Sequence, residues 1–186
     1  MNTTNAGEHI LQTKKWITEV VVGCGFCPFA AKEINRSSIH YEVLHGADLS
    51  SALCAVMKMM YMLDENENIE TSFLILPDSF LLFDDYMELN HLAETLLAKE
   101  NYEGIFQLAG FHPQYLFAGS TEDDASNYTN RSPYPMLHFL REESVSKAVD
   151  NYADVDNIPL RNIEFTKQKG LAYMKQLFAA AYLLKK

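Results

Sequence analysis

The sequence predicts an α/β (or α+β) fold, with a small, mainly parallel sheet of three to four strands packed by helices, followed by C-terminal helices. Short apolar segments rich in β-branched residues alternate with longer segments whose apolar residues recur at helical spacing. Strands separated by helices need crossover connections, and these favour parallel pairing. Only helical patterns follow residue 132.

The length of 186 residues suits one domain, 1–186, in which residues 1–8 are expected to form a flexible leader. This leader has neither the basic start nor the apolar centre of a secretory signal. No apolar run reaches the roughly 18 residues that a membrane-spanning helix needs. Three cysteines, an odd and small number, indicate reduced thiols and a cytoplasmic location.

The chain is acidic, with a net charge of −10. Such a chain repels the phosphate backbone of nucleic acids and the anionic surface of a membrane, so neither is expected as a partner. A small molecule remains the expected ligand. The sequence specifies no cofactor and no oligomeric state.

The first two predicted helices flank a cysteine motif. Residues 10–22 carry apolar side chains at helical spacing, and Gly23 stands where a C-cap glycine is expected. Pro28 suits the first position of the next helix, which would make Cys27 its N-cap.

Strands and helices then alternate. Residues 39–44 are expected to form the first strand, and Asp48 to cap the helix after it. Residues 73–76 are continuously apolar, which is typical of a strand covered on both faces. An apolar stripe predicts a helix over 86–97, and residues 104–109 are expected to form the third strand.

A long loop separates these elements from the C-terminal helices. Residues 118–131 show no periodicity, and loops of that length are usually functional or disordered. We expect Pro133 or Pro135 to start a helix that reaches Ala148, and the last helix to cover about 162–184.

Positive and hydrogen-bonding side chains gather where this loop meets the predicted helix. Asn130, Arg131 and Ser132 precede the helix, whose first N–H groups attract anions. His138 and Arg141 would share one helical face. Together these groups could hold a phosphate or carboxylate.

The alternative interpretation pairs these arginines with nearby carboxylates. The first would bind Asp123 or Asp124 of its own loop, and the second Asp85 or Glu88. The acidic run 122–124 could bind a hard cation, but such runs are more often solvated loop tips. We therefore predict no metal site.

The cysteine motif and one histidine supply the candidate chemistry. At a helix N-terminus the thiolate of Cys27 would be favoured, so it could act as a nucleophile; otherwise it is a buried, inert thiol. Cys24 and Cys27 also have the spacing of a redox pair. His112 follows the third strand, where ligands of parallel sheets bind, so it is either a general base or structural.

At these residues the chain resembles a bacterial family known as domain of unknown function fourteen-fifteen. The resemblance runs from about residue 16 to residue 170, with four specific parts: the segment 27–30, the strand ending at Pro77, and the segments 111–119 and 127–144. The family's cysteine motif usually has one thiol, which corresponds to Cys27. The resemblance implies an uncharacterised activity and weakens the redox interpretation.

The leading prediction is a small-molecule site built from Cys27, His112, Arg131, His138 and Arg141, in which the arginines hold an anionic metabolite. In this site His112 or His138 would act as general base, and Cys27 as nucleophile or polar wall. The first alternative is a non-catalytic module that binds a protein or a metabolite. The second is a thiol redox protein that uses the Cys-x-x-Cys pair.

Overall fold

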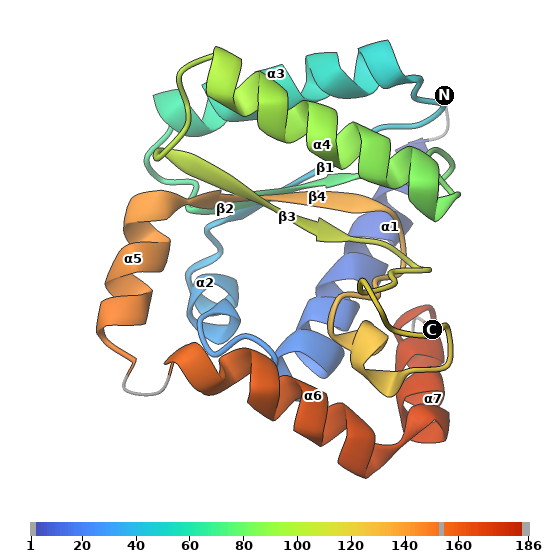
Figure 1. Cartoon of the computed structure of the whole chain (residues 1–186). Coiled ribbons are helices and arrows are strands. Elements are labelled where there is room, and N and C mark those ends of the chain that lie inside the picture. Colours follow the sequence, from blue (N-terminus) through green and yellow to red (C-terminus); the bar gives the residue numbers. More distant parts are fainter. Residues whose placement is uncertain (1–2, 153–154, 184–186) are drawn as a thin grey trace.

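The computed structural model describes residues 3–152 and 155–183. Its centre is a four-stranded mixed sheet in the order β1-β2-β4-β3 (Figure 1). Strands β1 (Ile39–Val43) and β2 (Thr71–Ile75) are parallel. Strand β4 (Met136–Arg141) runs antiparallel to β2 and to β3 (Phe106–Phe111).

Helices α3 (Leu49–Glu65) and α4 (Phe83–Lys99) cover one face of this sheet (Figure 1). As expected, Asp48 caps α3, because its carboxylate accepts a hydrogen bond from the N–H of Ser51 at 2.8 Å. The apolar side of both helices packs on the alternate residues of the strands that point toward them, including Leu74 and Leu137.

The opposite face meets a second layer. Here α1 (Thr3–Trp16) continues into a π-helix, η1 (Ile17–Val22), and a turn leads to α2 (Ala30–Arg36). The C-terminal helices α6 (Ile158–Lys169) and α7 (Leu171–Ala181) complete this layer (Figure 1).

The second layer has its own core. Trp16, Phe73 and Met136 are buried in it with residues of α7. The remaining short elements are η2 (Ala125–Thr129), α5 (Glu142–Asp150) and η3 (Val155–Asn157).

The predicted helix after Pro133 is wrong, because residues 136–141 form the central strand β4. Met136, Leu137 and Phe139 are fully buried, and both neighbouring strands bond to β4. Helical spacing is not informative here, because a strand covered on both faces is apolar at nearly every position. The helix α5 begins only at residue 142.

The prediction of a mainly parallel sheet is also wrong. Strand β4 enters at the C-terminal end of β3 and runs back between β3 and β2, so only the β1–β2 pair is parallel. The α/β composition, the four strands and the C-terminal helices agree with the sequence-based expectation.

Smaller differences concern the two ends of the chain. Helix α1 begins at residue 3, within the segment expected to be a leader. The predicted last helix is divided at Gly170, whose positive φ of 80° ends α6 before α7 begins. Within the described residues no helix is both long and apolar enough to cross a membrane.

Candidate functional site

Arg131 binds the backbone of its own loop. Its Nε–H donates to the carbonyl of Tyr115 at 3.2 Å, and Nη2–H donates to the carbonyl of Glu122 at 3.0 Å. The guanidinium also lies 4.7 Å from the ring centre of Tyr128. Arg131 therefore holds the long loop closed, through carbonyl oxygens and not through the aspartates considered above.

Its two neighbours in sequence also make local contacts. The side-chain amide of Asn130 donates to the carbonyl of Gly110 at 3.4 Å. The buried hydroxyl of Ser132 donates to the carbonyl of Tyr134 at 2.6 Å. These bonds shape the turn that leads into β4.

Arg141 lies at the other end of β4, about 17 Å along the strand from its first residue. Its guanidinium donates to the carbonyls of Leu63, Asn66 and Ile69, at and just beyond the C-terminus of α3. A cation is favourable there because it satisfies free carbonyls and the helix dipole. Residues 136–141 form a strand and not a helix. The helix N-terminus that was expected to bind an anion together with the two arginines is therefore absent.

His112 is fully buried and both of its ring nitrogens are bonded. Nε2–H donates to the carbonyl of Phe80 at 3.0 Å, and Nδ1 accepts from the N–H of Gln114 at 3.0 Å. Burial lowers the pKa of His112, so the ring is neutral. It packs against Phe83 and Tyr86 of α4, across the sheet from the layer that contains Cys27.

The side chains of His138 and Arg141 lie on opposite faces of the sheet. Its ring stacks on Phe73 with centroids 4.0 Å apart, and Nε2 lies 2.6 Å from the hydroxyl of Thr71. Burial lowers the pKa of His138 to about 3. His138 and Cys27 therefore face the same layer, but the histidine is neutral and held within the sheet.

The cysteine turn connects η1 with α2. Cys27 is half-buried and lies two residues before Phe29, the N-cap of α2, so the prediction of Cys27 as N-cap is wrong. Burial raises the pKa of Cys24, and the charge of Lys169 only partly opposes this. The Cys24 thiol is thus protonated at neutral pH, which makes it a poor attacking group.

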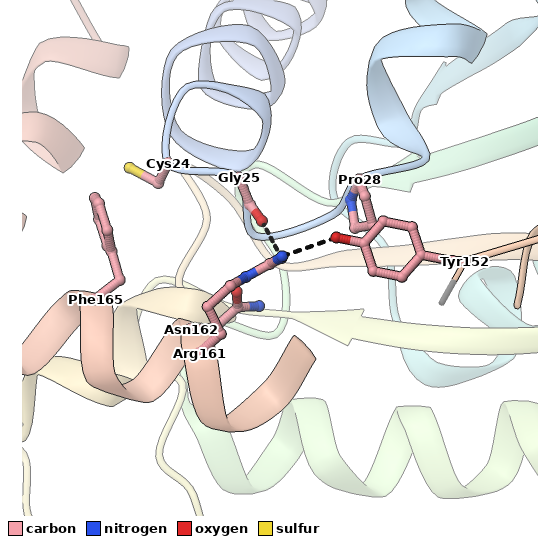
Figure 2. A pocket seen from close by; sticks show the side chains of 7 residues that line it. All are labelled: Cys24, Gly25, Pro28, Tyr152, Arg161, Asn162 and Phe165. Carbon is pink, nitrogen blue, oxygen red and sulfur yellow. Dashed lines mark hydrogen bonds between the residues drawn. The ribbon is translucent and has the colours of Figure 1, made fainter. Parts of the chain in front are cut away.

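A cavity of about 390 Å³ opens between this turn and α6. Figure 2 shows the seven residues that line it: Cys24, Gly25, Pro28, Tyr152, Arg161, Asn162 and Phe165. Two of them fasten α6 to the turn, because Arg161 donates to the carbonyl of Gly25 at 2.8 Å and Asn162 donates to that of Phe26 at 2.8 Å.

Arg161 is the charged group of this cavity. Besides Gly25, it donates to the hydroxyl of Tyr152 at 2.9 Å (Figure 2). Within the described residues no carboxylate lies at ion-pair distance from it. The sequence gives no signal for Arg161 and Asn162, since nothing in the local pattern of α6 connects them with a turn 136 positions earlier.

The π-helix η1 sets the position of the turn. The N–H of Gly23 donates to the carbonyl of Thr18 at 3.0 Å, five residues back, as in a π-helix. Such segments are rare and often occur at functional sites. Gly23 does end this helix, as the sequence predicts, but its φ is −61°, so a left-handed conformation is not the reason for glycine.

The reason is close approach: a Cβ on Gly23 would lie 2.2 Å from the carbonyl oxygen of Glu19. We expect Gly23→Ala to lower the free energy of unfolding by about 2 kcal/mol, because the backbone must shift. Gly7→Ala, in α1 and with open space around the new methyl, is the matched control and should be neutral or stabilising. Urea denaturation of both variants measures the difference, and equal stabilities would refute the close-approach argument.

A second cavity, of about 760 Å³, lies between α3 and β1. Its wall has Lys58 but also Glu42 and Asp48, so it carries no net positive charge. In the described part of the chain no group of three or more His, Cys, Asp or Glu side chains is placed to hold a metal ion.

Comparisons with known proteins agree with the lineage that the motifs suggest. No curated protein and no solved structure matches the chain. One family model matches residues 8–176, which include the cysteine turn, the sheet, the long loop and α6. The chain therefore belongs to the family described as "Protein of unknown function (DUF1415)".

Proposed function

We propose that the protein binds a small anionic ligand in the cavity between the cysteine turn and α6, with Arg161 as the principal contact. The supporting observation is a guanidinium without a carboxylate partner in the described structure, lining a cavity in a chain of net charge −10. A guanidinium has five N–H groups, and two are used here, so three remain for a ligand.

A second cation strengthens the positive potential. Lys169 lies two turns after Arg161 on α6, with its ammonium 5.6 Å from the ring centre of Phe165, which lines the cavity. Its charge also acts on Cys24. A phosphate or carboxylate attached to an apolar body would match this arrangement, because the rings of Tyr152 and Phe165 supply apolar walls.

The raised pKa of Cys24 supports binding more than nucleophilic or redox chemistry at this thiol. All four residues first considered as ligand contacts (Asn130, Arg131, Ser132 and Arg141) are engaged with backbone carbonyls. The anion is therefore still expected beside the cysteine motif and bound by an arginine, but this arginine is Arg161 of α6.

A thermal-shift screen with phosphate- and carboxylate-bearing metabolites tests the proposal. A ligand at a hundred times its Kd stabilises the folded state by about 2.7 kcal/mol, which raises the Tm by about 5–10 °C for a chain of this size. We expect Arg161→Gln to abolish the shift.

Arg36→Gln is the matched control, because Arg36 is an exposed arginine on α2 that does not line the cavity. It should keep the full shift. An equal ligand response in wild type and Arg161→Gln, with both variants folded by circular dichroism, would refute Arg161 as the principal contact.

A further inference from the structure

A second group of titratable side chains lies at the opposite end of α1 from the cysteine turn. His9 of α1 meets His45, which follows β1, and Asp78, which follows β2. Tyr134, just before β4, completes the group. Residue 9 is about 22 Å along the helix from Cys24, so this group is separate from the Arg161 cavity.

The group is ordered by hydrogen bonds from the two loops. The carboxylate of Asp78 accepts from Nδ1–H of His45 and from the N–H of Gly46, each at 2.9 Å. His45 is thereby fixed beside His9, with ring centroids 5.3 Å apart. The ring of Tyr134 meets His9 edge-on, with centroids 4.8 Å apart.

His9 occupies this place without a hydrogen bond at its buried nitrogen. Its Nδ1 is enclosed and has no partner among the described residues. A proton added there would have no acceptor, and a cation on the ring would face His45. Docking therefore favours the neutral ring of His9 over the charged ring.

The surrounding charges act in both directions on His9. Burial lowers its pKa most, His45 lowers it further, and the carboxylates of Glu8 and Asp78 oppose both effects. Tyr134, which itself binds Gln12, faces the ring as a neutral group. The pKa of His9 is lowered overall, so the docked helix keeps the ring neutral at a pH where a free histidine would be charged.

Ile10 packs against the core of the second layer, and the other polar contacts of α1 lie further along the helix. Trp16 Nε1–H donates to the carbonyl of Arg131 at 3.0 Å, and Lys15 donates to that of Ala180 at 2.9 Å. Gln12 donates to the carbonyl of Tyr182 at 3.1 Å. The first part of α1 thus relies on His9 for its contact with the loops after β1 and β2.

We propose that His9 makes the docking of the first part of α1 pH-sensitive, so that protonation in mildly acidic solution releases residues 6–11 from the loops after β1 and β2. The sign follows from linkage. The released helix binds a proton with the ordinary pKa of about 6.5, and the docked helix resists it, so docking weakens as the pH falls.

Hydrogen exchange measured by mass spectrometry tests this inference. Exchange rates are divided by the intrinsic rates at each pH, which gives protection factors that can be compared between pH 7.5 and 5.5. For a released pKa of 6.5 and a ring that stays neutral when docked, protection of residues 6–11 should fall by about tenfold. Substituting His9 should leave the pH response of the segment around Trp16 unchanged, since its contacts do not include this histidine.

Two variants remove the titration in different ways. His9→Phe keeps a ring between His45 and Tyr134, and His9→Asn keeps a polar group near the place of Nδ1. In either variant that remains folded, the protection of residues 6–11 should become independent of pH. His91→Phe is the control, because His91 is an exposed histidine on α4, and it should behave as wild type.

Equal protection of residues 6–11 at both pH values in the wild type would overturn the inference. So would an unchanged tenfold fall in the two His9 variants, because the proton would then bind elsewhere.

Discussion

Lowering the pH from 6.5 to 4.5 is expected to reduce the free energy of unfolding by about 2 kcal/mol through His138 alone. Burial beneath the sheet lowers the pKa of this histidine to about 3, while in the unfolded chain it returns to about 6.5. Below pH 6.5 His138 therefore binds a proton in the unfolded state but not in the folded state, and this difference favours unfolding.

The magnitude follows from the pH interval. Each pH unit between the two pKa values costs about 1.4 kcal/mol, so two units cost at most about 2.7 kcal/mol. At pH 6.5 half of the unfolded chains already carry this proton, which reduces the loss to about 2 kcal/mol. The loss continues until the pH reaches the folded pKa near 3.

Urea denaturation at pH 6.5, 5.5 and 4.5 checks this prediction. His138→Gln cannot titrate, so it should lose about 2 kcal/mol less than wild type between pH 6.5 and 4.5, although it is less stable at neutral pH because it loses the stacking on Phe73. His91→Gln, on the exposed side of α4, should follow the wild type. Parallel pH profiles for wild type and His138→Gln would show that His138 does not resist protonation.

Replacing Arg141 is expected to have the largest effect of any single arginine. Arg141→Met should lower the free energy of unfolding by about 3–4 kcal/mol, because a charged donor that binds three carbonyls disappears and those carbonyls lie partly out of water. The substitution also removes the guanidinium from above the ring of Phe106, where its carbon lies 5.6 Å from the ring centre.

Chemical denaturation measures this loss, and Arg36→Met is the matched control at an exposed position. Arg141→Lys should recover only part of the stability, since one ammonium cannot reproduce the guanidinium fork. A loss below 1 kcal/mol for Arg141→Met would contradict the structural role and would return Arg141 to the list of candidate ligand contacts.

Local sequence signals predicted the elements that depend on local chemistry. Asp48 caps α3 as expected, and the apolar run before Pro77 is a strand buried on both faces. Strand β4 was missed because its two covered faces remove the alternation that distinguishes strand from helix. The antiparallel insertion of β4 depends on the path of the long loop, which is decided by tertiary contacts such as Arg131 to Tyr115.

The site shows the same division. The sequence pointed to Cys27 as the candidate thiol, but the cysteine that lines the cavity is Cys24, which was considered only as its redox partner. Arg161 was not a candidate, because its role depends on a contact with Gly25, which is 136 positions away in sequence. His112 had two open interpretations, and the bonds at both nitrogens favour the structural one.

The π-helical segment between Trp16 and Gly23 also restricts how this chain can vary in length. Trp16 is fixed to Arg131, while Gly25 is fixed to Arg161. Each residue of an α-helix turns the chain by about 100°, so deleting one residue between these two anchors would swing the turn to a different side of the helix axis. The number of residues in this segment therefore fixes the direction in which the cysteine turn leaves the helix. An insertion or deletion there would separate Cys24 from α6 even if every side chain of the cavity were unchanged.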